Sequence, residues 1–317
     1  MTTSPASEKL KILRDRAVMF TTVRDFFAKR GVLEVDVPVL GKGAPIDLHI
    51  DVMAIPLQGG ERGFLHTSPE YAMKRLLSLG AGDIYQMSHV FRDGEVGHLH
   101  NPEFTMVEWY RVGMTFPQLI DETIAFIRLF LGDIPLYTYT YRSAMIEFAG
   151  VDYVTATPQD LITAAEKHGT HLPSDAPRWD KDTLLQYLMG FVVEPKLQGL
   201  SVIRDFPATQ SALAQTTVRD HEPIAERFEV YFRGTELANG FHELTDPIEQ
   251  RRRFHLANSQ RQEIGKTTLP LDEQFLTALE RGLPDCCGVA VGFDRLMLLR
   301  HDKKSLEDVL PFSWKTI

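Results

Sequence analysis

Two strand-like stretches of apolar and polar residues lie between residues 84 and 110. Residues 84–91 alternate in the manner of a β-strand, and so do the residues that follow the loop at 93–100. From Phe104 to Tyr110, every second side chain would project from one face of that second strand. The pattern therefore predicts a β-hairpin.

Near the start of the chain, the spacing of apolar residues is that of a helix. Apolar residues recur at helical spacing from Leu13 to Phe27, and Gly31 stands where a C-terminal cap is expected. Residues 33–39 then alternate, which predicts a strand, and Pro38 within it fits a sheet edge or bulge. Together they predict a long helix followed by an edge strand.

The middle of the chain gives weaker signals. Residues 159–168 and 181–191 have helical patterns, joined by a proline-rich link at 172–177. We interpret residues 133–200 as a mostly helical insertion within a core of helices and strands. The overall pattern predicts an α+β fold.

Composition and charge narrow the class of protein. The 317 residues are 44% hydrophobic, which is ample for a sizeable core, and no apolar run is long enough to span a membrane. Residues 1–9 lack the pattern of a secretory signal. Adjacent Cys286 and Cys287 argue against a disulfide or a structural zinc site. We therefore expect a cytoplasmic protein without a membrane partner.

A net charge of −9 gives little support to a nucleic-acid partner. The basic residues cluster only at Lys29–Arg30, Lys74–Arg75 and residues 251–253. We interpret each cluster as a solvated helix end or helix face.

The predicted hairpin at 84–110 also carries candidate chemistry. Arg92 stands at one lip of the loop, and a guanidinium binds phosphate or carboxylate through two parallel hydrogen bonds. On the second strand, Phe104 would stack on a base and Glu108 would accept an ammonium. The alternative is a surface hairpin with a solvated arginine.

Upstream of the hairpin, a helix start offers a further carboxylate. Ser68 suits the N-cap and Pro69 the first helical position. Glu70 in the first turn either binds an amino group or only interacts favourably with the helix dipole.

A second hairpin, at residues 227–244, is acidic. A tight Arg233–Gly234 turn would bring Glu229 and Glu236 near each other, and Mg²⁺ would relieve the repulsion between these carboxylates. Gly240 would admit a bulge that changes the direction in which Glu243 faces. The alternative is a solvated acidic face.

Residues 288–296 form a glycine-containing strand that enters a helix. Glycine permits a ligand to approach the backbone closely, and Arg295 at the helix start is placed to meet a phosphate. No P-loop sequence is present, so a nucleotide site of that kind is not supported.

Three segments of the chain together resemble the conserved motifs of class II aminoacyl-tRNA synthetases, most closely those of lysyl-tRNA synthetase. Residues 26–38 are similar to motif 1, residues 100–106 (His-Asn-Pro-Glu-Phe-Thr-Met) to motif 2, and residues 288–296 to motif 3. The resemblance implies a mixed, mostly antiparallel sheet flanked by helices, in one catalytic domain over residues 1–317. Motif 1 implies a homodimer.

The resemblance also implies roles for individual residues. The catalytic residues would be Arg92 and Arg295. The ATP site would comprise Arg92, Asp93, Gly94, Asn101, Phe104, Glu236, Leu237, Gly292 and Arg295. The amino-acid site would comprise Ser68, Pro69, Glu70, Glu108, Tyr110, Asn239, Glu243 and Ala290, with Glu70 on the α-amino group and Glu243 on the distal one. The cofactors would be ATP and Mg²⁺, the metal bound by Glu229 and Glu236.

The segment ahead of motif 1 has no room for the anticodon-binding OB-fold of a lysyl-tRNA synthetase. The chain thus resembles the stand-alone paralogues that transfer (R)-β-lysine to the ε-amino group of a lysine on elongation factor P, without stable tRNA binding. Ala290 stands where lysyl-tRNA synthetases usually have glycine, and Ser68 stands in place of a small apolar residue. Both substitutions fit a substrate whose amino group is shifted to the β carbon.

One departure from the family pattern leaves alternatives open. Gly94 stands where motif 2 has a glutamate, with Glu95 as a neighbouring substitute. Three hypotheses therefore compete: a ligase acting on elongation factor P, a truncated enzyme that charges tRNA with lysine, and a degenerate synthetase fold that acts as a binding module.

Overall fold

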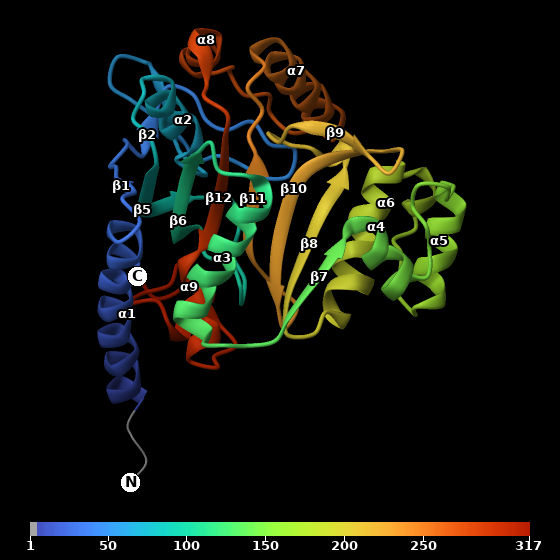
Figure 1. Cartoon of the computed structure of the whole chain (residues 1–317), viewed down its shortest axis with the longest axis horizontal. Helices are drawn as coiled ribbons and strands as arrows, with labels where there is room; N and C mark the ends of the chain where they lie inside the picture. Colours follow the sequence, from blue (N-terminus) through green and yellow to red (C-terminus); the bar gives the residue numbers. More distant parts are fainter. Residues whose placement is uncertain (1–4) are drawn as a thin grey trace. The chain divides into compact units, whose positions relative to one another are not determined.

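The computed structural model describes residues 5–317, which form two compact units (Figure 1). The first unit comprises the residues up to Gly132 together with Glu243–Ile317, and the second comprises Asp133–His242. The helical segment predicted as an insertion lies within the second unit. A single catalytic domain without an OB-fold remains a prediction. The α+β fold with a mixed, mostly antiparallel sheet is confirmed.

The strands of the first unit confirm the predicted hairpin. Four strands lie in the order β1-β5-β6-β12, with β1 parallel to β5 and the other pairs antiparallel. A small separate sheet has the order β2-β4-β3. The bounds are β1 (Leu33–Glu34), β5 (Ile84–Phe91), β6 (Glu103–Val112), β12 (Cys286–Gly292), β2 (Leu40–Gly41), β3 (Ala54–Pro56) and β4 (Arg62–Leu65).

The two faces of β6 have different surroundings. On one face, Trp109 packs against Phe27 and Phe126, with ring centroids 5.3 and 5.1 Å away, so helices cover this side. The opposite face carries Glu108 and Tyr110, the alternate positions predicted to share one side. The covering helices are α1 (Pro5–Ala28), α3 (Phe116–Leu131) and α9 (Phe293–Arg300), seen together in Figure 1.

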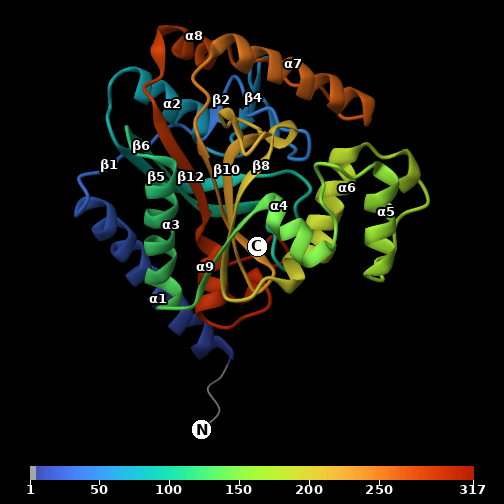
Figure 2. The same cartoon turned by 45° about the vertical axis from the view of Figure 1, so that its right-hand side comes forward.

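The other helices of the first unit pack against one another. Tyr71 of α2 stacks on Phe275 of α8, with ring centroids 4.4 Å apart, and α7 lies beside α8 (Figure 2). Their bounds are α2 (Glu70–Ser78), α7 (Pro247–Glu263), α8 (Glu273–Gly282) and the 3-10 turn η6 (Leu306–Asp308). No helix within residues 5–317 is both long and apolar enough to cross a membrane.

The helix predicted near the N-terminus is confirmed, whereas the strand predicted at 33–39 is wrong over most of its length. Gly31 adopts a φ of +68°, as a C-terminal cap requires, but β1 ends at Glu34. The amide of Val37 donates to the side-chain oxygen of Gln86 at 2.8 Å instead of to a strand. A buried side chain therefore ends the ladder that the alternation predicted.

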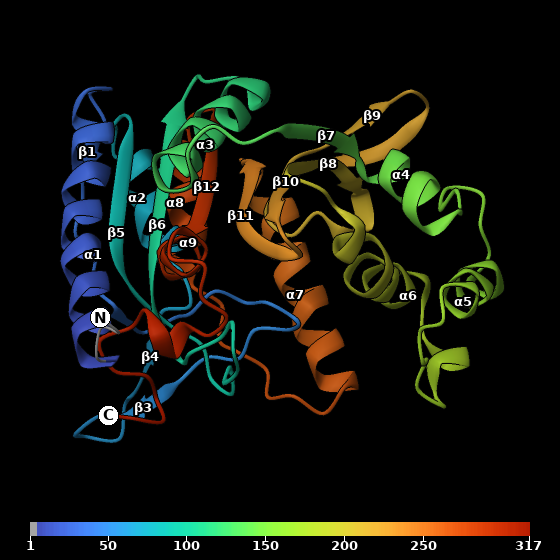
Figure 3. The same cartoon turned by 90° about the horizontal axis from the view of Figure 1, so that it is seen from below.

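The second unit contains a further set of strands. β11, β10, β8 and β7 lie in that order, β9 pairs with β10, and β7 is parallel to β8 (Figure 3). The strand bounds are β7 (Leu136–Thr140), β8 (Leu200–Pro207), β9 (Thr216–Arg219), β10 (Glu222–Phe232) and β11 (Thr235–His242).

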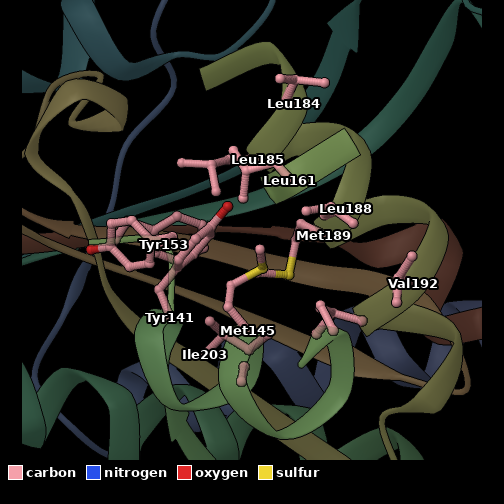
Figure 4. Packing of buried hydrophobic residues seen from close by; sticks show 14 of the residues in the cluster. Tyr141, Met145, Tyr153, Leu161, Leu184, Leu185, Leu188, Met189, Val192 and Ile203 are labelled. Atoms are coloured by element: carbon pink, nitrogen blue, oxygen red, sulfur yellow. The ribbon is translucent and has the colours of Figure 1, made fainter. Parts of the chain in front are cut away.

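The predicted helices of the second unit are present, and they enclose its core. Met145, Leu161 and Leu188 lie in one apolar cluster with Tyr141 and Ile203 (Figure 4). The helices and helical turns are α4 (Tyr141–Ala144), η1 (Met145–Ala149), α5 (Pro158–Lys167), η2 (Ala176–Arg178), α6 (Lys181–Leu188), η3 (Met189–Val193), η4 (Glu194–Lys196) and η5 (Ala208–Gln210).

Candidate active site

Glu108, on the face of β6 opposite Trp109, is held by two hydroxyl groups. Ser68 Oγ donates to its Oε2 at 2.7 Å and the Tyr110 hydroxyl to its Oε1 at 2.6 Å. Ser68 Oγ also accepts from the backbone N–H of Glu70 at 3.0 Å. The helix begins at Glu70, one residue later than predicted, with Pro69 as its cap residue. The helix start and the hairpin are therefore joined through Ser68.

Lys74, on the next turn of α2, lies between two carboxylates. Its Nζ is 2.6 Å from Glu70 Oε1 and 2.5 Å from Glu243 Oε2, and the residue is only 1% exposed. The prediction that Lys74 lies on a solvated helix face is wrong, because that face of α2 packs against the carboxylates. Arg75 is exposed, as predicted. We name Glu70, Lys74, Glu108 and Glu243 the acidic cluster.

Burial changes the charge states in the acidic cluster. Loss of solvent, followed by the nearby charge of Glu70, raises the pKa of Glu108 above its usual range. Burial also raises the pKa of Glu243, although the Lys74 ammonium acts against this effect. The pKa of Lys74 is raised despite its burial, because Glu243 and Glu70 favour its charged form. The cluster thus combines a fixed cation with carboxylates that a second cation would ionise.

Strand β12 closes one side of the acidic cluster. Gly288 lies opposite Tyr110 and Ala290 opposite Glu108. A Cβ at Gly288 would lie 2.4 Å from Glu243 Oε1 and 2.4 Å from the Tyr110 ring, so only glycine fits there. Ala290, in contrast, places its methyl group beside Glu108, as expected for a residue at a pocket wall.

Arg92 lies at the end of the same face of the hairpin. Its guanidinium carbon is 5.1 Å from the centroid of the Phe104 ring, and its buried Nε has no hydrogen-bond partner among residues 5–317. Its Nη1 is 3.8 Å from Glu95, the proposed substitute for the missing motif 2 glutamate. Gly94 has a φ of +74°, which disfavours a side chain, while Asp93 is exposed.

The remaining nucleotide candidates of the first unit lie beside the hairpin loop. Arg295 Nη2 is 3.0 Å from His100 Nε2, and Gly292 directly precedes α9. Burial, and then the charge of Arg295, lowers the pKa of His100. Asn101 uses both ends of its amide internally, donating to Glu103 O and accepting from Trp314 N.

The acidic hairpin of β10 and β11 contains a bulge that differs from the predicted one. The register shifts between Val230 and Tyr231, opposite Leu237, and not at Gly240. Glu229 pairs with Asn239, and Tyr231 pairs with Glu236. The extra residue places Glu229, Glu236 and Asn239 on one face, because cross-strand partners share a face. Leu237 itself is buried.

Glu229 is largely occupied by neighbouring groups. Arg227 Nη2 donates to its Oε1 and the Tyr231 hydroxyl to its Oε2. Beside it, the buried Oδ1 of Asn239 has no hydrogen-bond partner among residues 5–317. No group of three or more potential metal-binding side chains occurs in this described part of the chain. The hairpin therefore offers a pair of carboxylates, and that of Glu229 already accepts two hydrogen bonds.

The structure thus brings the predicted residues together within each unit. In the first unit, the predicted substrate residues Ser68, Glu70, Glu108 and Glu243 make direct contacts around Lys74. Sequence reasoning missed Lys74. Its position four residues after Glu70 was a usable signal, because such a spacing allows an ion pair on a helix.

Comparison with known proteins places these features in a family. The sequence profile of the class II tRNA synthetases (D, K and N) matches residues 3–316. The chain belongs to the class II tRNA synthetase family. Within this family, the chain is similar to curated relatives named "Elongation factor P--(R)-beta-lysine ligase". It is 44% identical over 314 residues to the relative from Haemophilus influenzae strain PittGG, covering 97% of this chain and 96% of the relative. It is 44% identical over 308 residues to that from Vibrio parahaemolyticus, covering 95% and 94%.

Proposed function

We propose that the chain is an ATP-dependent ligase that activates (R)-β-lysine as an aminoacyl-adenylate and transfers it to the ε-amino group of a lysine on elongation factor P. The names of its relatives support the substrate and the acceptor. The observation that carries the proposal is the buried acidic cluster, whose Glu108 lies on the same face of the β5–β6 hairpin as Arg92 and Phe104. Carboxylates in such surroundings suit the ammonium groups of a diamino acid.

The proposed reaction has two steps. In the first, a carboxylate oxygen of the amino acid attacks the α-phosphorus of ATP, and pyrophosphate leaves. Arg92 would bind the carboxylate and the α-phosphate, Phe104 would stack on adenine, and Arg295 would bind the terminal phosphate. In the second step, the acceptor's neutral amine attacks the acyl carbon, AMP leaves, and the amine proton passes to solvent. Positioning supplies much of the rate, since no protein nucleophile is required.

The acidic hairpin supports a proposal for magnesium. Magnesium binds through one or two carboxylates, with water and phosphate oxygens completing its shell, so a pair of glutamates on one face is a sufficient donor set. Glu236 shares that face with Glu229. Bound there, Mg²⁺ would offset negative charge on the departing pyrophosphate. Glu229 must first exchange one of its donors for the metal.

We further propose a cytoplasmic homodimer that does not bind tRNA stably. Leu10 and Val18 of α1 and Leu33 of β1 are exposed, and burial of this apolar stripe against a second copy would stabilise a dimer. The net charge of −9 disfavours a polyanion. An enzyme that modifies a translation factor would act where that factor is found.

Pyrophosphate exchange with the purified chain tests the proposal. The expected result is faster exchange with (R)-β-lysine than with α-lysine, and little exchange with norleucine or 6-aminohexanoate, each of which lacks one amino group. Faster exchange with α-lysine would favour a tRNA-charging enzyme. The absence of exchange with every substrate would favour a binding module, the hypothesis that Gly94 motivates.

A substitution at Ala290 sharpens this test. Ala290→Gly removes the methyl group opposite Glu108. We expect a shift of the β-lysine to α-lysine ratio toward α-lysine of about 1–3 kcal/mol, because one methyl group in a pocket discriminates by this amount. An unchanged ratio would contradict a role for Ala290 in selecting the isomer.

A further inference from the structure

The residue at the centre of the acidic cluster has no part in the proposed chemistry. Lys74 is enclosed, with a side chain that is 0% exposed, and its ammonium joins Glu70 on its own helix to Glu243 from another part of the first unit. Burial of a charge is costly unless it is paired. A lysine at such a position therefore needs a reason beyond helix packing.

We propose that Lys74 is a positioning and specificity-determining residue that holds Glu70 and Glu243 in fixed positions, so that each carboxylate can bind one of the two ammonium groups of a diamino acid. The proposal rests on the proposed function and deepens it. One oxygen of each carboxylate is bonded to the lysine, so the two acidic groups are held at either side of its ammonium. A substrate ammonium then meets a carboxylate whose direction is already fixed.

The charges of the acidic cluster support this assignment. With substrate bound and all three carboxyl groups in their charged form, the cluster would carry three negative charges and the Lys74 ammonium one positive charge. The net charge of two negative charges equals that needed to neutralise two substrate ammonium groups. Without the lysine, three carboxylates would repel one another and take up protons. The other titratable groups near the cluster include Tyr71, Tyr110 and Cys286. Burial raises the pKa of each, so all three are neutral at physiological pH.

A displaceable lysine, acting as a stand-in for the substrate, is less compatible with the structure. Met73 and Leu77 on either side of Lys74 in α2 are buried, so the helix has no freedom to turn the lysine outward. Such a movement would also break the ion pairs of the ammonium with two buried carboxylates. The lysine is thus expected to remain in place when the substrate binds.

The neighbouring residues of α2 provide a matched test. Lys74→Met removes the ammonium and keeps the apolar stem, whereas Arg75→Met removes a positive charge from the exposed side of the same helix. We expect Lys74→Met to weaken (R)-β-lysine binding by about 30-fold or more, with a smaller change in kcat. Arg75→Met should bind as the unchanged chain does. Equal binding by both variants would overturn the proposal.

A second variant separates positioning from a merely structural role. Lys74→Ala leaves space for the deleted atoms, and n-propylammonium reproduces them. We expect this amine to restore (R)-β-lysine binding to Lys74→Ala and to have no such effect on the unchanged chain. If Lys74→Ala is folded and n-propylammonium does not restore binding, the lysine acts only in packing and the proposal fails.

A measurement without substrate keeps this test distinct from that of the proposed function. The unchanged chain and Lys74→Met are unfolded thermally between pH 6 and 9. A carboxyl with a raised folded-state pKa contributes stability at low pH that is lost as pH rises through that pKa. The Tm of Lys74→Met should fall more steeply than that of the unchanged chain as pH rises, because the variant lacks the ammonium that stabilises ionised Glu243. Parallel curves would contradict the role of Lys74 even if β-lysine is not the substrate.

Discussion

The acidic cluster of the first unit and the acidic hairpin of the second both pair buried carboxylates with a cation, but they leave different capacity for a ligand. In the cluster, a lysine contacts two carboxylates through one atom. In the hairpin, Arg227 and Tyr231 occupy both oxygens of Glu229, and Arg227 also lies over the Phe206 ring.

This difference follows from the chemistry of the two cations. An ammonium is a compact charge with three donors, whereas a guanidinium is a planar group that combines ion pairing with stacking on an aromatic ring. The cluster is therefore suited to accept further ammonium groups, and the hairpin to place a carboxylate face beside a metal. Acidic residues alone do not distinguish the two, because the partner cation decides which oxygens remain for a ligand.

The largest expected effect is that of Glu243→Gln in the cluster. This change leaves Lys74 with one carboxylate partner and removes a charge from the predicted substrate site. We expect (R)-β-lysine binding, measured by calorimetry, to weaken about 100-fold, because truncating one partner of a buried charge pair costs several kcal/mol. Glu273→Gln, at an exposed ion pair of α8, is the control and should bind normally. Similar affinities in both variants would remove Glu243 from the site.

A smaller effect is expected from Gly288→Ala, which fills the space between β12 and the cluster. The added methyl group would press on Glu243 and the Tyr110 ring. We expect affinity for β-lysine to fall about tenfold because Glu243 must shift to make room for the methyl group. Stability should fall as well, since overpacking costs roughly 1–3 kcal/mol. Gly190→Ala in the second unit adds a methyl group in open space and serves as the control. An unchanged affinity for β-lysine in Gly288→Ala would show that binding does not require the close approach of β12 to Glu243.

The hairpin is tested by Glu236→Gln, with an expected effect of another kind. We expect the Mg²⁺ concentration for half-maximal pyrophosphate exchange to rise about tenfold while the KM for β-lysine stays unchanged. Glu236 would then act on the metal alone. A change in the KM for β-lysine with no change in the magnesium requirement would contradict the distinction between the two acidic regions.

The affinity for β-lysine should depend modestly on pH, through the carboxyl groups of the acidic cluster. The pKa of Glu108 is raised to about 7 and that of Glu243 to about 8, so each binds a proton near neutral pH. An ammonium favours the ionised forms, so binding should release protons and strengthen as pH rises from 6 to 8. Calorimetry in buffers of different ionisation enthalpy measures this release. Proton uptake would contradict the assigned charge states.

The sequence predicted those features that depend on local periodicity. The β5–β6 hairpin was predicted from the two-residue period of apolar side chains along its strands. The helices of the second unit were predicted from apolar residues that recur at helical spacing. The strand predicted at 33–39 was wrong because a side chain, that of Gln86, replaces a backbone partner there. Periodicity does not reveal a long-range bond of this kind.

The site was predictable to a similar extent. Family motifs indicated Glu70 and Glu243, but Lys74 was interpreted as a surface residue because neighbouring Arg75 is basic as well. Only the tertiary structure shows that one is buried and the other exposed. The bulge opposite Leu237 was also missed, since no glycine or proline marks that position. The functions of the individual site residues remain predictions.

A crystal structure with (R)-β-lysine and a non-hydrolysable ATP analogue tests the central claim most directly. We predict that both amino groups of β-lysine contact carboxylates of the acidic cluster, while the Lys74 ammonium still joins Glu70 to Glu243. An amino acid bound with its amino groups away from this cluster, or a Lys74 side chain displaced into solvent, would contradict it.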